Sequence, residues 1–318
     1  MTSLSTFLSI PSDKPKLLVI YWPTACGKTA LTVELAKLYE GEVISADSRQ
    51  IYRGMNIGTG KITPDEMQGI PHHMLDIRDI SESYSVGEYA PEVKHIISEI
   101  HARGKLPILS GGTWLFIDAV VGNFSLPETA PDWEYRAELE KIRETEWEQK
   151  LWDMLFAIDP DYAPLLDPRN YRYVMRGLEV FRATGKSKKS IGKLGEGQYD
   201  TFFLTPFDGN RAGLYERINE RVLGMFEQGL VEEVQKLMNN DQWPMTNEGG
   251  TILTSEILEK LPGLNAIGYR EVIDFLTWIK TIPEAIEAVQ TNSRHYAKRQ
   301  LTWFRRYQTE KIDGFFWA

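Results

Sequence analysis

Cysteine is almost absent from this sequence. Its 318 residues include one cysteine, Cys26, which excludes an internal disulfide framework and a cysteine-rich zinc module. His72 and His73 are adjacent rather than at the usual spacing of metal ligands, so we favour a structural or cavity-lining role for them over a zinc site. The scarcity of thiols fits a reducing compartment.

Long apolar stretches are also missing. No run approaches the length of about 20 residues that a membrane-spanning helix needs. Residues 1–15 lack the basic start and apolar core of a secretory signal. We therefore expect a cytoplasmic protein without a membrane partner.

The sequence has no overall excess of positive charge. A formal net charge of -9 argues against a protein coated all over in nucleic acid, although it leaves room for a local basic groove. The hydrophobic content of 42% and charged content of 25% are typical of a globular protein. The length allows one large domain or two of ordinary size.

Strand and helix patterns alternate in the first part of the chain. An apolar run at 17–21 and short segments at 42–45 and 107–110 predict strands, and helical spacing is found at 28–39 and 86–103. Strands separated by helices of this length indicate an α/β fold, with a parallel sheet covered by helices on both faces.

The pattern changes near residue 125. Helical spacing dominates from 133 to 185, which predicts a helical insertion at 125–200 within a core made of 1–124 and 201–318. Beyond the insertion we expect a strand at 201–204 and helices at 214–228, 231–238, 267–279 and 283–299. Residues 185–200 and 243–254 are predicted to be loops.

A candidate phosphate-binding loop follows the first strand. Residues 22–29, WPTACGKT, resemble G-x-x-x-x-G-K-[ST], in which backbone N–H groups and a lysine hold phosphate and a hydroxyl binds magnesium. Lys28 and Thr29 would take the last two roles. Trp22 replaces the first glycine, and a side chain there is expected to resist the backbone conformation and crowd the ligand. Weakened or lost activity with a retained fold is one consequence.

A carboxylate and an amide follow the second strand, in Asp47-Ser48-Arg49-Gln50. In a parallel sheet this position lies at the same edge as the phosphate loop. Asp47 is either the cap of an Asx turn or a group that holds magnesium water or acts as a general base. Gln50 could read the edge of an adenine.

Two basic clusters stand out on this acidic chain. The first has Glu179 as its single opposing acid, and the second contains no acid and is interleaved with aromatic residues. Each cluster alone reads as a solvated helix face, but both have the composition of RNA phosphate contacts and stacking surfaces. They comprise Arg169, Arg172, Arg176, Arg182, Lys186, Lys188 and Lys189, and Arg294, Lys298, Arg299, Arg305 and Arg306.

Taken together, several motifs resemble the tRNA dimethylallyltransferase family. The resemblance runs in order from about residue 16 to 307. Its motifs are WPTACGKT at 22–29, ISADSRQIY at 44–52, GIPHH at 69–73, YSV at 84–86, GGT at 111–113 and YAKRQLTWFRR at 296–306.

The resemblance implies a P-loop NTPase-like core and a reaction. A dimethylallyl group would move from dimethylallyl diphosphate to N6 of adenosine 37, in tRNAs that read codons beginning with U. The residues implied to bind diphosphate are Thr24, Ala25, Cys26, Gly27, Lys28 and Thr29, with Mg2+ on Thr29. Asp47 matches the general base, Thr113 matches a threonine near the reacting base, and Arg217 matches an arginine that reaches the diphosphate.

The resemblance also implies contacts with the tRNA anticodon stem-loop. The target base must leave its stack to reach the reacting group, and we expect a monomer to bind the RNA. The residues assigned to tRNA are Asp47, Ser48, Arg49, Gln50, Arg172 and Arg176, together with the basic C-terminal group Arg294, Lys298, Arg299, Arg305 and Arg306.

Three alternatives stay open at this point. A small-molecule phosphotransferase would explain Lys28 and Thr29 but not the basic clusters. An enzyme that prenylates free AMP or ATP would have little need of the insertion. A catalytically impaired RNA-binding relative is supported by Trp22.

Overall fold

The computed structural model describes residues 3–21, 23–122, 132–191, 196–207, 209–238, 257–258, 261–305 and 310–311. It divides into two compact units, a core of 1–121 and 198–318 and an insertion of 122–197. The prediction from sequence places the insertion at 125–200.

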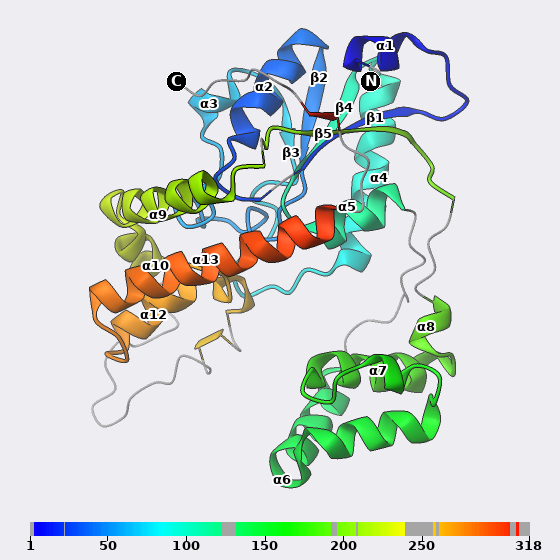
Figure 1. Ribbon diagram of the computed structural model, residues 1–318, viewed down its shortest axis with the longest axis vertical. Helices are drawn as coiled ribbons and strands as arrows, with labels where there is room; N and C mark the ends of the chain where they lie inside the picture. The colour runs from blue at the N-terminus through cyan, green and yellow to red at the C-terminus, as the bar shows by residue number, and fades with distance from the viewer. Residues whose placement is uncertain are drawn as a thin grey trace. The chain divides into compact units, whose positions relative to one another are not determined.

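The core contains a parallel sheet with strand order β3-β2-β4-β1-β5-β6 (Figure 1). All neighbouring strands pair in parallel. The predicted α/β class with a parallel sheet is therefore confirmed. The strands are β1 (Lys16–Tyr21), β2 (Gly41–Ser45), β3 (His72–His73), β4 (Leu106–Gly111), β5 (Asp200–Thr205) and β6 (Glu310–Lys311).

Helices cover both faces of this sheet. Leu17, Val19 and Tyr21 of β1 pack in one cluster with α4 (Val86–Ala102) and α5 (Trp114–Val121). Leu18 and Ile20 point to the other face and pack with α2 (Lys28–Leu38) and α1 (Leu4–Ser9). Because side chains alternate across a strand, a strand between two helical layers reads as a continuous apolar run.

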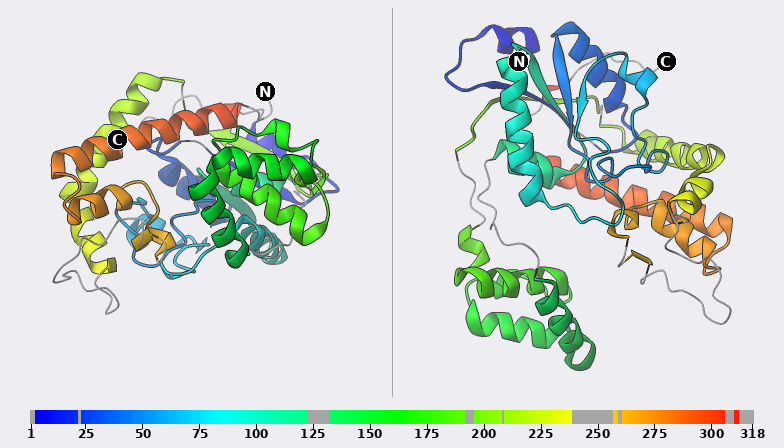
Figure 2. Two further views of the ribbon diagram at one scale, coloured as in Figure 1. Left: turned by 90° about the horizontal axis from the view of Figure 1, so that it is seen from below. Right: turned by 180° about the vertical axis from the view of Figure 1, so that it is seen from behind.

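Between β5 and β6, the described part of the core is helical. It contains α9 (Arg211–Glu227), α10 (Leu230–Met238), α12 (Tyr269–Leu276), α13 (Ile282–Phe304) and the 3-10 turn η2 (Pro262–Leu264). The long helix α13 lies beside α9 and α12, as Figures 1 and 2 show. The centre of its Phe304 ring lies 4.6 Å from that of Tyr21, the last residue of β1. This contact packs the end of α13 against the carboxyl end of the strand.

Several elements differ from the predictions. The helix predicted at 283–299 continues to Phe304, and the one predicted at 267–279 is shorter, because Gly268 (φ 96°) precedes α12 as its N-cap. The predicted loop 185–200 contains a short helix, α8 (Lys188–Ile191). The predicted loop 243–254 lies outside the described residues. The short helix α3 (Pro64–Met67) was not predicted.

The described part of the insertion consists of helices, as predicted. Helices α6 (Trp133–Ile158) and α7 (Tyr171–Thr184) pack together through Leu139, Leu151, Leu155, Val174 and Leu178, with η1 (Ala163–Leu165) beside them. Arg136 of α6 donates two hydrogen bonds to the buried Glu179 of α7, at 2.5 and 2.8 Å. Among the described residues of both units, no helix has the length and apolarity needed to cross a membrane.

Candidate active site

A cavity of about 420 Å³ lies at the carboxyl edge of the sheet. Its walls come from the loops after β1, β2 and β4, from the 58–60 loop, and from α9 and α13. This is the place where open parallel sheets bind ligands. The predicted site residues that line it are Thr24, Ala25, Gly27, Lys28, Thr29, Asp47, Ser48, Arg49, Gln50 and Arg299.

The phosphate loop has the backbone of an anion site. Ala25 (φ 61°) and Gly27 (φ 69°) are both left-handed, and Gly27 is the N-cap of α2. The free N–H groups at the start of α2 therefore belong to the same loop that lines the cavity. Cys26 is buried beside Leu214 and Leu301 instead of lining the cavity. Trp22 lies outside the described residues.

Lys28 is half-buried at this loop. Its Nζ donates to the Pro23 carbonyl at 2.8 Å. The pKa of Lys28 is lowered to about 8, chiefly by the burial of its ammonium group and also by nearby Arg221, whereas Cys26 and Asp47 act in the opposite direction. Phosphate oxygens are the partners that such a desolvated ammonium group favours.

Two arginines of α9 reach the phosphate loop in different ways. Arg217 Nε donates to the Ala25 carbonyl at 3.2 Å, but Arg217 does not line the cavity. Arg221, one turn later, lines the cavity and donates from Nη1 to Thr24 Oγ1 at 2.9 Å. Burial lowers the pKa of the Arg221 guanidinium, which Asp47 partly offsets.

Asp47 lines the cavity and also closes an Asx turn. Its Oδ1 accepts the Arg49 N–H at 2.8 Å, so the local turn and the cavity-facing position coexist. Thr113 does not line the cavity. It supports the Asp47 turn from outside, because its Oγ1 accepts the Ser48 N–H at 3.0 Å. The neighbouring Gly112 carbonyl accepts from Gln300 Nε2 at 2.7 Å.

Gln50 lines the cavity with its amide already oriented by the protein. Oε1 accepts from Ser45 Oγ at 3.1 Å, and Nε2 donates to the carbonyls of Thr59 and Gly60 at 3.4 and 3.3 Å. Its assignment to the edge of an adenine stays a prediction.

The basic residues in and just after α13 differ in position and contacts. Arg299 lines the cavity, whereas Lys298 and the C-cap residue Arg305 are exposed and do not line it. Arg294 is held within the core by Asn219 Oδ1 at 2.5 Å and by Thr291. Arg306 lies outside the described residues.

The basic residues of the insertion are likewise of two kinds. Arg172 is exposed and its guanidinium lies 5.9 Å from the centre of the Tyr171 ring. Arg176 donates to the buried Glu179 at 3.1 Å. Arg172 therefore has the more accessible charge of the two.

Sequence reasoning missed several residues that line the cavity. Arg221 follows Arg217 by four residues, so helical spacing could have identified it as a neighbour on the same face. Burial and the nearby Asp47 raise the pKa of the lining residue Tyr296 to about 12. An apolar wall made of Ile218, Val222, Met225, Ile267 and Val289 also had no motif to reveal it.

The oxygen atoms at the cavity would suit a magnesium ion that is also bound by phosphate. Thr29 and Asp47 both line the cavity, and Mg2+ usually takes one or two protein oxygens together with phosphate oxygens and water. The described residues contain no group of three or more His, Cys, Asp or Glu side chains placed to hold a metal without such help.

Comparisons with known proteins identify the family of this chain. The sequence model of the IPP transferase family matches residues 50–307. The tRNA dimethylallyltransferase of Halalkalibacterium halodurans is 44% identical over 294 residues, covering 92% of this chain and 88% of that protein. The enzyme of the same name from Caldanaerobacter subterraneus subsp. tengcongensis is 40% identical over 296 residues, covering 92% and 89%.

Solved structures are similar as well. The full-length tRNA isopentenylpyrophosphate transferase of Bacillus halodurans matches with a TM-score of 0.65 and 43% identity, covering 94% of this chain and 90% of that one. A eukaryotic dimethylallyltransferase described as acting on tRNA matches with a TM-score of 0.73 and 30% identity, covering 91% and 70%. The chain therefore belongs to the IPP transferase family, the family of the tRNA dimethylallyltransferases.

Proposed function

We propose that this protein transfers a dimethylallyl group from dimethylallyl diphosphate to N6 of adenosine 37, in tRNAs that read codons beginning with U. As a family member it is a prenyltransferase that acts on tRNA. One observation carries the finer proposal: the lysine-bearing phosphate loop and Asp47 line the same cavity.

The cationic end of this cavity is suited to a diphosphate leaving group. Diphosphate gains negative charge as its bond to carbon breaks, and fixed positive groups stabilise that charge. Lys28 and Arg221 are half-buried and line the cavity. We assign the arginine contact to Arg221, with Arg217 bracing the Ala25 carbonyl behind the loop.

The apolar wall suits the prenyl chain. Ile218 and Val222 lie on α9, within one turn of Arg221, so a ligand held by Arg221 would lie beside them. A dimethylallyl group has five carbon atoms and no polar atom, and burying it against such side chains is favourable. A phosphotransferase site has no need of this wall.

Asp47 is suited to the proton transfer. The lone pair of adenine N6 is delocalised into the ring, so N6 becomes a good nucleophile only as it loses a proton. Asp47 Oδ1 is oriented by the Arg49 N–H, and the carboxylate would accept the N6 proton as the new carbon–nitrogen bond forms. Thr113 supports this turn through Ser48.

Magnesium would be held by Thr29 and by the diphosphate oxygens. Bound there, Mg2+ supplies charge stabilisation to the leaving diphosphate. The observation in its favour is the place of Thr29 beside Lys28 at the cavity.

We propose the tRNA anticodon stem-loop as the partner of a cytoplasmic monomer. Arg299 at the cavity and the exposed Arg172 of the insertion are the cations best placed to bind its phosphates. A phosphotransferase or an enzyme acting on free AMP would have little use for the insertion.

The test is transfer of radiolabelled dimethylallyl to an anticodon stem-loop with A36-A37-A38, followed by mapping of the modified base. The parent is compared with Trp22→Gly and with a substrate that lacks A37. Product at A37 from the parent supports the proposal. Product with free AMP but not with RNA would favour the alternative, and silence in both proteins would leave an RNA-binding relative.

A further inference from the structure

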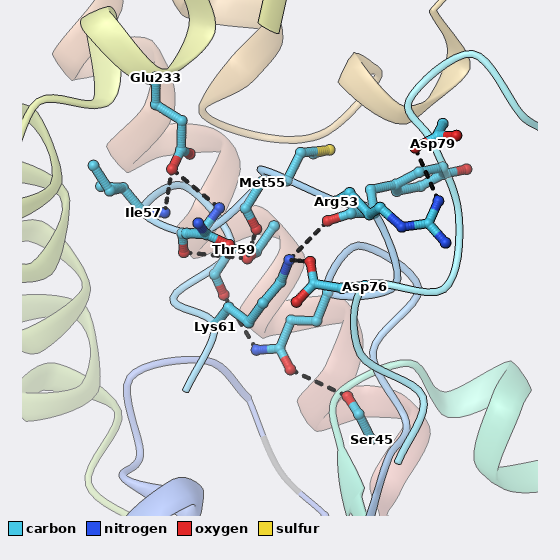
Figure 3. Close-up of polar contacts among 12 residues, drawn as sticks. Ser45, Arg53, Met55, Ile57, Thr59, Lys61, Asp76, Asp79 and Glu233 are labelled. Atoms are coloured by element: carbon cyan, nitrogen blue, oxygen red, sulfur yellow. Dashed lines mark hydrogen bonds and ion pairs between the residues drawn. The ribbon is translucent and has the colours of Figure 1, made fainter. Parts of the chain in front are cut away.

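The loop 56–60 is tied to helix α10 by a single carboxylate. Glu233 Oε2 accepts the N–H groups of Asn56 and Ile57 at 3.0 and 2.8 Å, and Oε1 accepts that of Gly58 at 3.3 Å (Figure 3). Three consecutive N–H groups that converge on one anion form a nest, a motif that usually holds a phosphate or another ligand. Here the anion is a side chain of the protein.

Tyr269 of α12 completes this arrangement. Its hydroxyl donates to Glu233 Oε1 at 2.6 Å. A Cβ atom on Gly58 would lie 2.4 Å from the Tyr269 ring, so the loop backbone rests directly on this ring. Glu233 and Tyr269 therefore both hold the backbone of residues 56–58, Glu233 by hydrogen bonds and Tyr269 by packing.

The other end of the loop is tied down as well. The buried Lys61 donates from Nζ to the Tyr52 carbonyl at 2.7 Å and to Asp76 at 2.5 Å (Figure 3). Thr59 Oγ1 donates to the Met55 carbonyl at 2.7 Å. Residues 56–60 thus run between two anchors, of which Glu233 is the one supplied by a distant part of the sequence.

The fixed loop offers its carbonyl groups to two cavity residues. The Thr59 carbonyl accepts from Gln50 Nε2 at 3.4 Å and from Arg221 Nη2 at 3.3 Å. The Gly60 carbonyl accepts from Gln50 Nε2 at 3.3 Å. Gln50 and Arg221 both line the cavity, but they come from separate elements and share this loop as a common support.

We propose that Glu233, braced by Tyr269, is a positioning residue that fixes the 56–60 loop so that its carbonyls orient Gln50 and Arg221 together. This rests on the proposed function, in which Arg221 contacts diphosphate, and on the prediction from sequence that Gln50 reads the edge of an adenine. Glu233 touches neither substrate. It couples the two ends of the cavity through backbone that both residues share.

The test is Glu233→Gln, which keeps the size of the side chain but loses its charge and turns an amide toward N–H donors. Glu232→Gln is the matched control, because it makes the same change at the preceding position of α10, which is exposed. We expect Glu233→Gln to raise the KM for dimethylallyl diphosphate and the KM for the stem-loop each by roughly tenfold. The control should leave both unchanged.

Double variants distinguish a positioning role from a general loss of stability. In an Arg221→Lys background, Glu233→Gln should no longer raise the KM for the diphosphate, and in a Gln50→Ala background it should no longer raise the KM for RNA. Independent effects in both backgrounds would overturn the proposal, as would a fall in Tm with both KM values unchanged. Tyr269→Phe, which removes one hydroxyl, should shift both KM values in the same direction but less.

Two further readouts keep this test separate from the proposed function. Amide hydrogen exchange of residues 56–58 should accelerate in Glu233→Gln, and the affinity for dimethylallyl diphosphate, measured by calorimetry without RNA, should fall. Both should hold even if the parent transfers nothing, a result that would refute the proposed function alone. Unchanged exchange and unchanged affinity would overturn the positioning role whatever the activity.

Discussion

Lys28 shows how the fold sets the charge of a single residue at the phosphate loop. Burial lowers its pKa to about 8, so the ammonium form dominates below pH 8 and is lost as the pH rises through 8. Cys26 and Asp47 oppose this lowering of the Lys28 pKa. The residue that we propose to hold the diphosphate is therefore also one whose charge the fold makes sensitive to pH.

We accordingly expect kcat/KM for dimethylallyl diphosphate, measured at saturating RNA, to fall above pH 8, by about tenfold per pH unit well above the pKa. At saturating diphosphate the decline should begin at a higher pH, because the bound anion favours the protonated amine. A profile that stays flat to pH 9.5 would contradict this role for Lys28.

Helix α9 places Arg217 and Arg221 differently, although they lie one turn apart. Arg221 lines the cavity and Arg217 bonds to the back of the phosphate loop. We expect Arg221→Gln to raise the KM for diphosphate by roughly 10- to 100-fold, the size of effect seen when a charge-assisted hydrogen bond is lost. Arg217→Gln, the matched control, should have a smaller effect. Steady-state kinetics of both variants would check this, and the reverse order would assign the contact to Arg217.

A second prediction at the scale of the element concerns Gly60 in the 56–60 loop. Gly60 and Gly69 both have left-handed backbone (φ 56° and 80°), but a Cβ on Gly60 would lie 2.0 Å from Arg221 Nη2, whereas Gly69 has open space. Each alanine substitution should cost about 1–2 kcal/mol of folding free energy from backbone strain. Gly60→Ala should in addition raise the KM for diphosphate, which Gly69→Ala should not. Equal kinetics for the two variants, measured with their urea unfolding curves, would show that Arg221 does not depend on this contact.

The elements also show what sequence patterns can and cannot predict. β1, β2 and β4 are buried on both faces, and each was predicted from the consecutive apolar residues that it contains. The phosphate loop followed from a local motif. Glu233 and Tyr269 were not found, because they reach residues 56–58 from positions far along the chain, and no local spacing records such a contact.

The whole molecule consists of a core that holds the cavity and a helical insertion that carries the exposed Arg172. Sequence reasoning grouped all the arginines of each basic cluster. The structure separates Arg176, which pairs with Glu179, from the exposed Arg172, and separates Arg294, which bonds to Asn219, from Arg299 at the cavity. A charge count cannot distinguish these, because tertiary partners decide which charges stay available.

We therefore expect Arg172→Glu to weaken stem-loop binding and to reduce the slope of log Kd against log salt by about 1. The KM for diphosphate should not change. Lys236→Glu is the control, because it makes the same charge change on an exposed face of α10 that does not line the cavity. Binding titrations at several salt concentrations would test this, and equal slopes for the two variants would remove the insertion from the RNA interface.

The central claim is that Asp47 and the phosphate loop act on one reaction within one cavity. Its most direct test is the single-turnover rate of dimethylallyl transfer by Asp47→Asn, with both substrates saturating and their binding measured in parallel. We predict a rate about 10²- to 10⁴-fold lower, as expected for the loss of a general base, with both substrates still bound. Transfer at the parental rate by this variant would contradict the account.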